Sequence, residues 1–249
     1  MSFDDQFSQL AQQYAQFRPQ SPPELANFFA SITPAHSLAL DCGTGSGQAA
    51  RALAEHYTTV IACDPSRAQI ANALPHGRVH YLVAQAERLP AKSNVFDLIT
   101  VAQAVHWFDL DAFYGEARRL LKPGGGILAV WTYYLFESEA EIDAVIAHYN
   151  DEVLGPYWSP RLKAVREKYR TLPFPFEELA APDIAMQTDW DLAQVTGYLA
   201  SWSATSPYQE KLGRHPLNEV YERLLAAWGD PAEKKSIRWP LFIRVGKMA

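Results

Sequence analysis

A glycine-rich segment after a short apolar run holds the residues whose types and spacing could do chemistry most directly. It reads Asp41-Cys42-Gly43-Thr44-Gly45-Ser46-Gly47 and follows the run 37–40. Glycines let the backbone turn tightly and let a ligand approach it closely. In open α/β sheets, ligands bind beyond the carboxyl ends of the strands, where such a turn would lie. The segment therefore predicts a turn that binds a nucleotide-like ligand.

Two acids near this turn narrow the choice of ligand. A dinucleotide turn reads G-x-G-x-x-G, but Gln48 stands at its third glycine position and Gly47 comes one residue early. Asp41 would repel phosphate oxygens and attract a ligand that carries a positive charge. Asp64 follows the next apolar run, where an acid accepts hydrogen bonds from ribose hydroxyls, although it could simply favour the start of a helix. An adenosine-like, positively charged ligand without phosphates fits this pattern.

The turn and four further segments, in order, resemble the class I S-adenosylmethionine-dependent methyltransferases. The turn matches the first motif of that family, and Asp64 lies in a segment similar to the second. The others are similar to the stretch that packs on adenine and to the exit of the fourth strand and entry of the fifth: 84–90, 102–109 and 121–130. Tyr14 and Arg18, in a Y-x-x-x-R-P pattern, resemble the small-molecule branch that contains the trans-aconitate methyltransferases. The resemblance covers residues 10–132 well.

The resemblance implies S-adenosylmethionine as the cofactor and no metal ion. His106 is a candidate general base, because histidine titrates near neutral pH, but a buried structural role is equally compatible with its position. Arg18 and Trp107 are candidate acceptor-binding residues, and Trp107 could instead be part of the core. The residues expected to contact the cofactor are Asp41, Gly43, Thr44, Gly45, Gly47, Asp64, Pro65, Ala86, Glu87, Gln103, Ala104 and Tyr14.

The acceptor of such a reaction is expected to be a small molecule. Methyl transfer is an in-line displacement on an already activated carbon, so the enzyme mainly positions the acceptor and excludes water. A carboxylate acceptor needs no base but needs an arginine to orient it, and Arg18 is the candidate. A phenol or amine would involve His106 instead. Two alternatives stay open: an NAD(P)-dependent oxidoreductase, weakened by Asp41 and Gln48, and a non-catalytic adenosine-binding module, since fold alone does not fix function.

The elements that position these residues are five short apolar runs, which alternate with helical patterns between residues 37 and 131. Continuous apolar strands alternating with helices predict a parallel sheet covered on both faces, and right-handed crossovers make it doubly wound. The fold class is therefore α/β, with a mostly parallel seven-stranded sheet. The resemblance implies two further strands near 183–189 and 237–245, the last one antiparallel, and Pro240 indicates an edge or a bulge there.

The chain is expected to form one domain over residues 1–249 with four parts. Residues 1–34 form a helical cover, 37–131 the cofactor-binding core, 132–208 an aromatic-rich insertion that acts as a lid, and 209–249 a C-terminal helix and the final strand. Apolar residues at helical spacing predict helices over 3–17, from about 22 to 32, and over 217–228. The basic run 161–170 has the same spacing and predicts a solvated helix face rather than an anion site.

Composition excludes several classes of function. The formal net charge is −6, which does not provide the basic surface that sequence-independent nucleic-acid binding needs. The start of the chain is polar and no apolar run approaches the ~20 residues of a membrane span, so a cytoplasmic protein without membrane contact is expected. Cys42 and Cys63 are expected to be buried, reduced thiols. The oligomeric state is left open.

Overall fold

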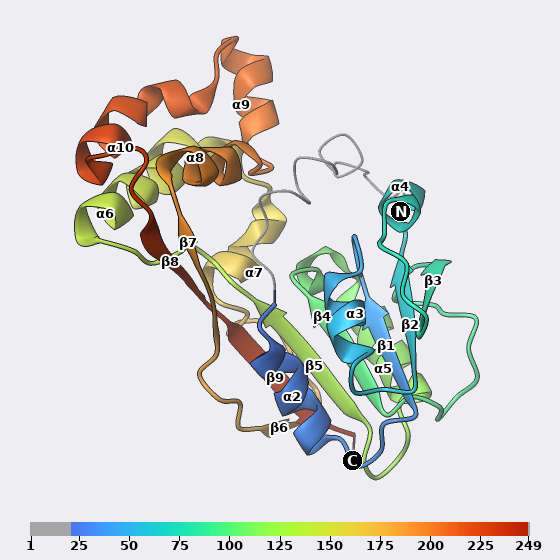
Figure 1. The fold of residues 1–249 in the computed structure, drawn as a ribbon. Coiled ribbons are helices and arrows are strands. Elements are labelled where there is room, and N and C mark those ends of the chain that lie inside the picture. The colour runs from blue at the N-terminus through green and yellow to red at the C-terminus, as the bar shows by residue number, and fades with distance from the viewer. Residues whose placement is uncertain (1–20, 249) are drawn as a thin grey trace.

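The computed structural model describes residues 21–248, so the expected helix over 3–17, with Tyr14 and Arg18, lies outside the described residues. A seven-stranded sheet forms the centre of the molecule (Figure 1). In spatial order its strands are β3 (Val79–Val83), β2 (Thr59–Asp64), β1 (Leu38–Cys42), β4 (Leu98–Ala102), β5 (Ile127–Thr132), β9 (Phe242–Lys247) and β6 (Glu177–Leu179).

The first five strands are parallel, as predicted, and the chain reverses its direction across the sheet between β1 and β4. Ligands of doubly wound sheets bind at this switch point, beyond the carboxyl ends of the strands. The glycine-rich turn directly follows β1 and therefore lies at that position. The doubly wound α/β fold is confirmed.

The prediction for the last two strands is wrong in two respects. The strand near 183–189 exists as β7 (Ala185–Trp190), but it pairs with β8 (Lys235–Pro240) in a separate two-stranded sheet. The run 237–245 is not one strand, because the chain leaves β8 at Pro240 and enters the main sheet as β9. Proline has no N–H to donate and interrupts a strand ladder. As predicted, β9 is antiparallel; its other neighbour is the short edge strand β6.

The helices fall into two groups. Four flank the main sheet and follow the alternating pattern of the sequence: α2 (Pro23–Ile32), α3 (Gln48–Leu53), α4 (Arg67–Ala71) and α5 (Leu110–Leu120). Most of the others gather around β7 and β8 beyond one end of the sheet (Figure 1): α6 (Ala140–His148), α8 (Leu192–Ala200), α9 (Thr205–Leu212) and α10 (Tyr221–Trp228). In the second group α10 packs against α6, so it contains helices from before and after residue 208. The predicted boundary between the insertion and the C-terminal part at residue 208 stays a prediction.

The helix expected over the basic run 161–170 is largely absent. Only α7 (Lys163–Arg166) forms there, after a 3-10 turn. Lys168 and Tyr169 have a φ of +58° each, in the left-handed region that ends a right-handed helix. The apolar spacing of this run is therefore satisfied by a turn rather than by a continuous helix.

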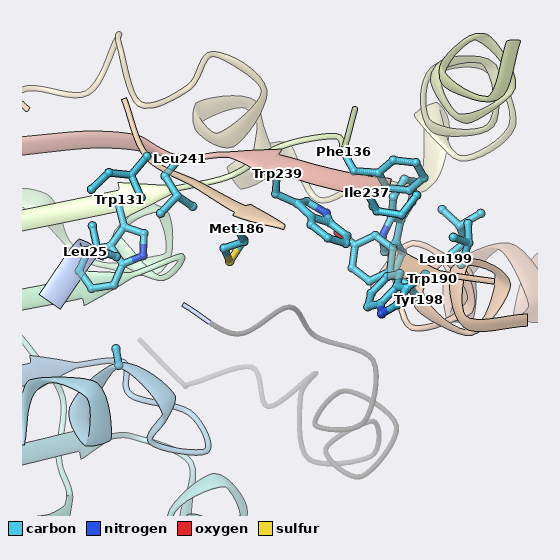
Figure 2. Close-up of a cluster of buried hydrophobic side chains, with 14 of the residues drawn as sticks. Leu25, Trp131, Phe136, Met186, Trp190, Tyr198, Leu199, Ile237, Trp239 and Leu241 are labelled. Atoms are coloured by element: carbon cyan, nitrogen blue, oxygen red, sulfur yellow. The ribbon is translucent and has the colours of Figure 1, made fainter. Parts of the chain in front are cut away.

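Apolar side chains form a core on each face of the sheet. Successive strand residues point to opposite faces, so Ala39 packs with α2 and α3 whereas Leu40 packs with α5. The first core continues along the sheet into the group around β7 and β8, where Tyr198 and Trp239 are almost fully buried (Figure 2). The aromatic residues of the insertion are thus mainly core, and they pack this group against the sheet.

Two further findings concern membrane-spanning helices and the cysteines. No helix within residues 21–248 is long and apolar enough to cross a membrane, and the cytoplasmic location stays a prediction. Both Cys42 and Cys63 are buried and free, which confirms the prediction for the thiols.

Candidate active site

The glycine-rich turn makes a narrow connection with open space on one side. Gly43 has a φ of +65°, and a Cβ there would lie 2.6 Å from the Cβ of Ala104, so the turn touches the exit of β4. Gly45 has a φ of +55°, but the nearest atom to its Cβ would be the side-chain oxygen of Gln69 at 3.9 Å. Close packing therefore explains Gly43, whereas at Gly45 the missing side chain leaves room that a ligand could fill. This geometry fits the expected cofactor turn.

Asp41, the last-but-one residue of β1, is fully buried under this turn. Its carboxylate accepts hydrogen bonds from the hydroxyls of Thr44 (2.6 Å) and Thr100 (2.8 Å). Burial raises its pKa from 3.8 to about 6, although both hydroxyls lower it. At neutral pH the carboxylate is charged and places a negative potential beside the turn, which fits a ligand with a positive charge.

Asp64, at the end of β2, ties the turn to the next strand. One carboxylate oxygen accepts from the backbone N–H of Gly45 (3.0 Å) and the other from that of Ser66 (2.8 Å). A carboxylate at this position also fits the predicted contact with ribose hydroxyls. Asp64 therefore has a structural role in addition to the predicted ribose role, and Pro65 follows it directly at the mouth of the turn.

The segment expected beside adenine lies against the same edge. Ala86 is buried in the same apolar cluster as Cys42 and Cys63, on the α5 side of the sheet. The carboxylate of Glu87 accepts a hydrogen bond from the backbone N–H of Asp109 (3.0 Å), the residue that caps α5. The contact of Ala86 and Glu87 with adenine stays a prediction.

Gln103 adopts an uncommon backbone conformation where the chain leaves β4. Its φ is +54°, which is costly for a residue other than glycine, and such residues cluster at functional sites. Its side-chain amide donates to the carbonyl of Tyr133 (3.0 Å) and accepts from the hydroxyl of Thr132. Gln103 therefore joins the exits of β4 and β5, next to Ala104, which touches the cofactor turn.

A cavity of about 110 Å³ opens beside Gln103, between the exits of β4 and β5 and the helical group around β7 and β8. Tryptophan and tyrosine rings make up a large part of its walls, and the polar side chains are an amide pair, two serines, a histidine and an arginine. The residues that line it are Gln103, His106, Trp107, Tyr133, Tyr134, Leu135, Asn150, Trp158, Leu162, Val165, Arg166, Tyr198, Ser201, Trp202 and Ser203. The structure thus brings the predicted residues Gln103, His106 and Trp107 together in the wall of one cavity. The next residue after Gln103 is Ala104, which touches the cofactor turn.

His106 is 8% exposed in the wall of this cavity. Its Nδ1 forms a 2.7 Å hydrogen bond with the hydroxyl of Tyr169. Burial, together with the positive charge of Arg161, lowers the pKa of His106 to about 3. The imidazole is therefore neutral at physiological pH and is a weak base, which argues against the predicted role in proton abstraction.

Arg166 and Asn150 also line the cavity, and the sequence prediction missed both. Arg166 was assigned to a solvated helix face, but its Nη2 donates to the carboxylate of Asp151 (2.9 Å) and contacts the carbonyl of Asn150 (3.4 Å). Asn150 is 2% exposed and lies in a π-helical turn, Tyr149–Val153, a feature frequent at functional sites. Spacing in the sequence gave no signal for either residue, because the cavity assembles from distant segments.

Comparisons with known proteins identify the family of the chain. A family model described as a methyltransferase domain matches residues 40–129. A Dictyostelium discoideum protein provisionally named as a methyltransferase is 33% identical over 253 residues, which cover 98% of this chain and 95% of the relative. A solved structure from Anaeromyxobacter dehalogenans, provisionally described as a type II methyltransferase, is 42% identical and superposes with a TM-score of 0.87, covering 93% of this chain and 98% of that one.

The fold also occurs in enzymes solved with the demethylated cofactor. A Haemonchus contortus phosphoethanolamine N-methyltransferase, solved with S-adenosylhomocysteine, has a TM-score of 0.50 at 18% identity, covering 99% of this chain and 60% of that one. Within residues 21–248 no group of three or more His, Cys, Asp or Glu side chains could hold a metal ion. Since the similarity to the Dictyostelium relative spans nearly the whole chain, the chain belongs to the class I S-adenosylmethionine-dependent methyltransferases, with S-adenosylmethionine as its methyl donor.

Proposed function

We propose that this methyltransferase acts on a small molecule and methylates a carboxylate oxygen, giving a methyl ester. The observation that carries the proposal is the charge in the acceptor cavity. Among the described lining residues, Arg166 carries the one formal charge, because His106 is neutral and no Asp or Glu takes part. Arg166 pairs with Asp151 (2.9 Å), which lies outside the cavity lining. An anionic acceptor would therefore share the guanidinium with Asp151, whereas a cationic amine would find no carboxylate in the lining.

The size of the cavity supports a small acceptor, or one small group of a larger one. An apolar cavity of about 150 Å³ is known to hold benzene, and this one measures about 110 Å³. Its aromatic walls exclude water and would pack against the carbon skeleton, while polar groups orient the acid. Ordering the acceptor beside the donor is the main contribution that such an enzyme makes.

The weak basicity of the site supports an acceptor that needs no deprotonation. S-adenosylmethionine, when bound, supplies an already activated methyl group. Residues of the turn and Asp64 would hold it, and Gln103 and Ala104 would lie between it and the cavity. A carboxylate is ionised at neutral pH and offers its lone pairs directly, so a histidine with a pKa of about 3 does not limit the reaction. A phenol or an amine would need a stronger base.

The orienting arginine in this proposal is Arg166. Guanidinium groups hold carboxylates through paired N–H donors. Arg166 has five N–H donors; Asp151 and Asn150 engage its Nη2, and the hydroxyl of Tyr134 is a further partner. The earlier candidate, Arg18, lies outside the described residues, so its role stays a prediction. The assignment to the trans-aconitate branch also stays a prediction, although a carboxylate acceptor agrees with it.

Substitution of Arg166 tests the proposal. Arg166→Gln should raise the KM for a carboxylate acceptor by about 10- to 100-fold, as expected for loss of a hydrogen bond to a charged group, and leave the Kd of S-adenosylmethionine unchanged. Arg170→Gln is the matched control, because Arg170 is exposed in the same segment but does not line the cavity. Equal KM values for the two variants would contradict the proposal.

A further inference from the structure

Tyr169 approaches the acceptor cavity from behind His106. It is fully buried, and its hydroxyl lies 2.7 Å from Nδ1 of His106. The imidazole is part of the cavity wall, and no described residue forms a hydrogen bond with its other nitrogen, Nε2. A polar group that is more than nine-tenths buried normally has a partner, so Nε2 is available to a bound molecule.

The backbone at Tyr169 has an energetically unfavourable conformation. Two successive residues that are not glycine, Lys168 and Tyr169, have a φ of +58°, and each such residue costs about 1–3 kcal/mol. Arg244 of β9 stabilises this turn by donating to the carbonyls of Tyr169 (3.1 Å) and Leu172 (2.6 Å). The ammonium of Lys168 lies 4.6 Å from the ring centre of Phe242. Contacts from β9 thus fix the turn that directs the Tyr169 hydroxyl at His106.

The chemistry of the pair indicates which group donates. A neutral imidazole has one protonated nitrogen and one acceptor nitrogen, and the partner of one nitrogen decides the state of the other. A phenol is the stronger donor of the two groups and a bare ring nitrogen the stronger acceptor. The 2.7 Å separation is also short for a donated N–H, whose usual distance is about 2.9–3.0 Å.

We propose that Tyr169 is a positioning residue, which donates its hydroxyl to Nδ1 of His106 and thereby fixes the imidazole as the Nε2–H tautomer facing the acceptor. His106 then presents a neutral hydrogen-bond donor to the cavity. Its low pKa keeps this state through the physiological pH range. The next step rests on the proposed function. The Nε2–H of His106 would donate to one carboxylate oxygen of the acceptor, while Arg166 supplies the positive charge.

The opposite arrangement has a definite structure as well. The hydroxyl of Tyr169 would then point to Thr132, its other side-chain partner, and Nδ1 of His106 would carry the ring proton and donate it to the phenol oxygen. Nε2 would become an acceptor, and His106 could accept a proton from a phenol or amine. The two arrangements differ in which ring nitrogen is protonated, so spectroscopy separates them.

The experiment is a long-range ¹H–¹⁵N correlation spectrum of the histidine rings in the full-length protein without an acceptor. The His106 signals are assigned by their loss in His106→Gln. We expect Nδ1 to be the unprotonated nitrogen in the wild type. Tyr169→Phe should give both tautomers, with nitrogen shifts that move toward each other. Tyr114→Phe is the matched control, because Tyr114 is also buried and its hydroxyl donates over 2.7 Å to the carbonyl of Pro173.

Protonated Nδ1 in the wild type, or unchanged His106 shifts in Tyr169→Phe, would overturn the proposal. These spectra need no acceptor, so they fail or succeed independently of the proposed function. For a carboxylate acceptor, Tyr169→Phe should raise KM by roughly 3- to 10-fold, the range for a neutral hydrogen bond, without changing the Kd of S-adenosylmethionine. A KM equal to that of Tyr114→Phe would show that the donor does not touch the acceptor.

Discussion

Asp41→Asn should make the protein more stable at neutral pH and weaken cofactor binding. The carboxyl of Asp41 is fully buried, and burial raises its pKa from 3.8 to about 6. One pKa unit corresponds to about 1.4 kcal/mol, so ionisation of this group costs the folded state roughly 3 kcal/mol above pH 7. An amide has no such cost. It can keep the local bonds, because the hydroxyl of Thr100 can also donate to the carbonyl of Leu40 (3.3 Å) and accept from the amide.

The sign of the pH dependence follows from the two pKa values. Below pH 3.8 the group is protonated in the folded and unfolded states, and the cost is absent. As the pH rises past 3.8 the unfolded chain loses this proton first, whereas the folded protein keeps it until about pH 6. The wild type therefore loses stability as pH rises, and about half of the loss, roughly 1.5 kcal/mol, falls between pH 5 and pH 8.

Urea denaturation of both proteins at pH 5 and pH 8, followed by circular dichroism, measures this component. All other titrating groups are common to both proteins and cancel in the difference between their free energies of unfolding. We expect this difference to grow by about 1.5 kcal/mol in favour of Asp41→Asn between the two pH values. Asp183→Asn is the control, because its side chain is 85% exposed. Parallel pH profiles for wild type and Asp41→Asn would refute the reasoning.

Three further substitutions test the cofactor turn. Gly45→Val should abolish S-adenosylmethionine binding, measured by calorimetry, because the side chain would enter the open space beside the turn; unchanged affinity would mean that the turn is purely structural. Gly43→Ala should lower the melting temperature, because its Cβ would lie 2.6 Å from the Cβ of Ala104. Gly115→Ala is the control: a Cβ at this position of α5 would have no atom within 4 Å, so the helix propensity of alanine should keep or raise the melting temperature. Asp64→Ala should weaken S-adenosylmethionine binding by about 1.5–3 kcal/mol and also lower stability, because two backbone N–H groups lose their acceptor; lower stability with unchanged affinity would leave it only a structural role.

The cofactor side of the site was predictable because it is local in the sequence. The turn after β1 and the acid after β2 are short motifs, and parallel strand order places them at one sheet edge. The five parallel strands followed from apolar runs of strand length. Pro240 indicated an irregularity in the last predicted strand. That its two halves, β8 and β9, belong to different sheets was not predictable, because it depends on the strand with which each half pairs.

The acceptor side was not predictable in the same way. Arg166 and Tyr169 lie in a run whose apolar spacing matches a helix, and the turn at Lys168 overrides that pattern. The turn is stabilised by Arg244, which lies 75 residues further along the chain from Tyr169. Likewise Asn150 reaches the cavity only because a π-helical turn ends α6. Contacts between distant segments, rather than local preference, decide these positions.

The chemical nature of the methylated product is the most direct evidence for or against methylation of a carboxylate. The protein is incubated with S-adenosylmethionine labelled in the methyl group and with a panel of small carboxylic acids, each paired with its carboxamide. We expect label transfer to one or more acids but not to the amides, and release of that label as volatile methanol in mild base, as for a methyl ester. Label that stays bound in base, or transfer only to phenols or amines offered in the same panel, would contradict it.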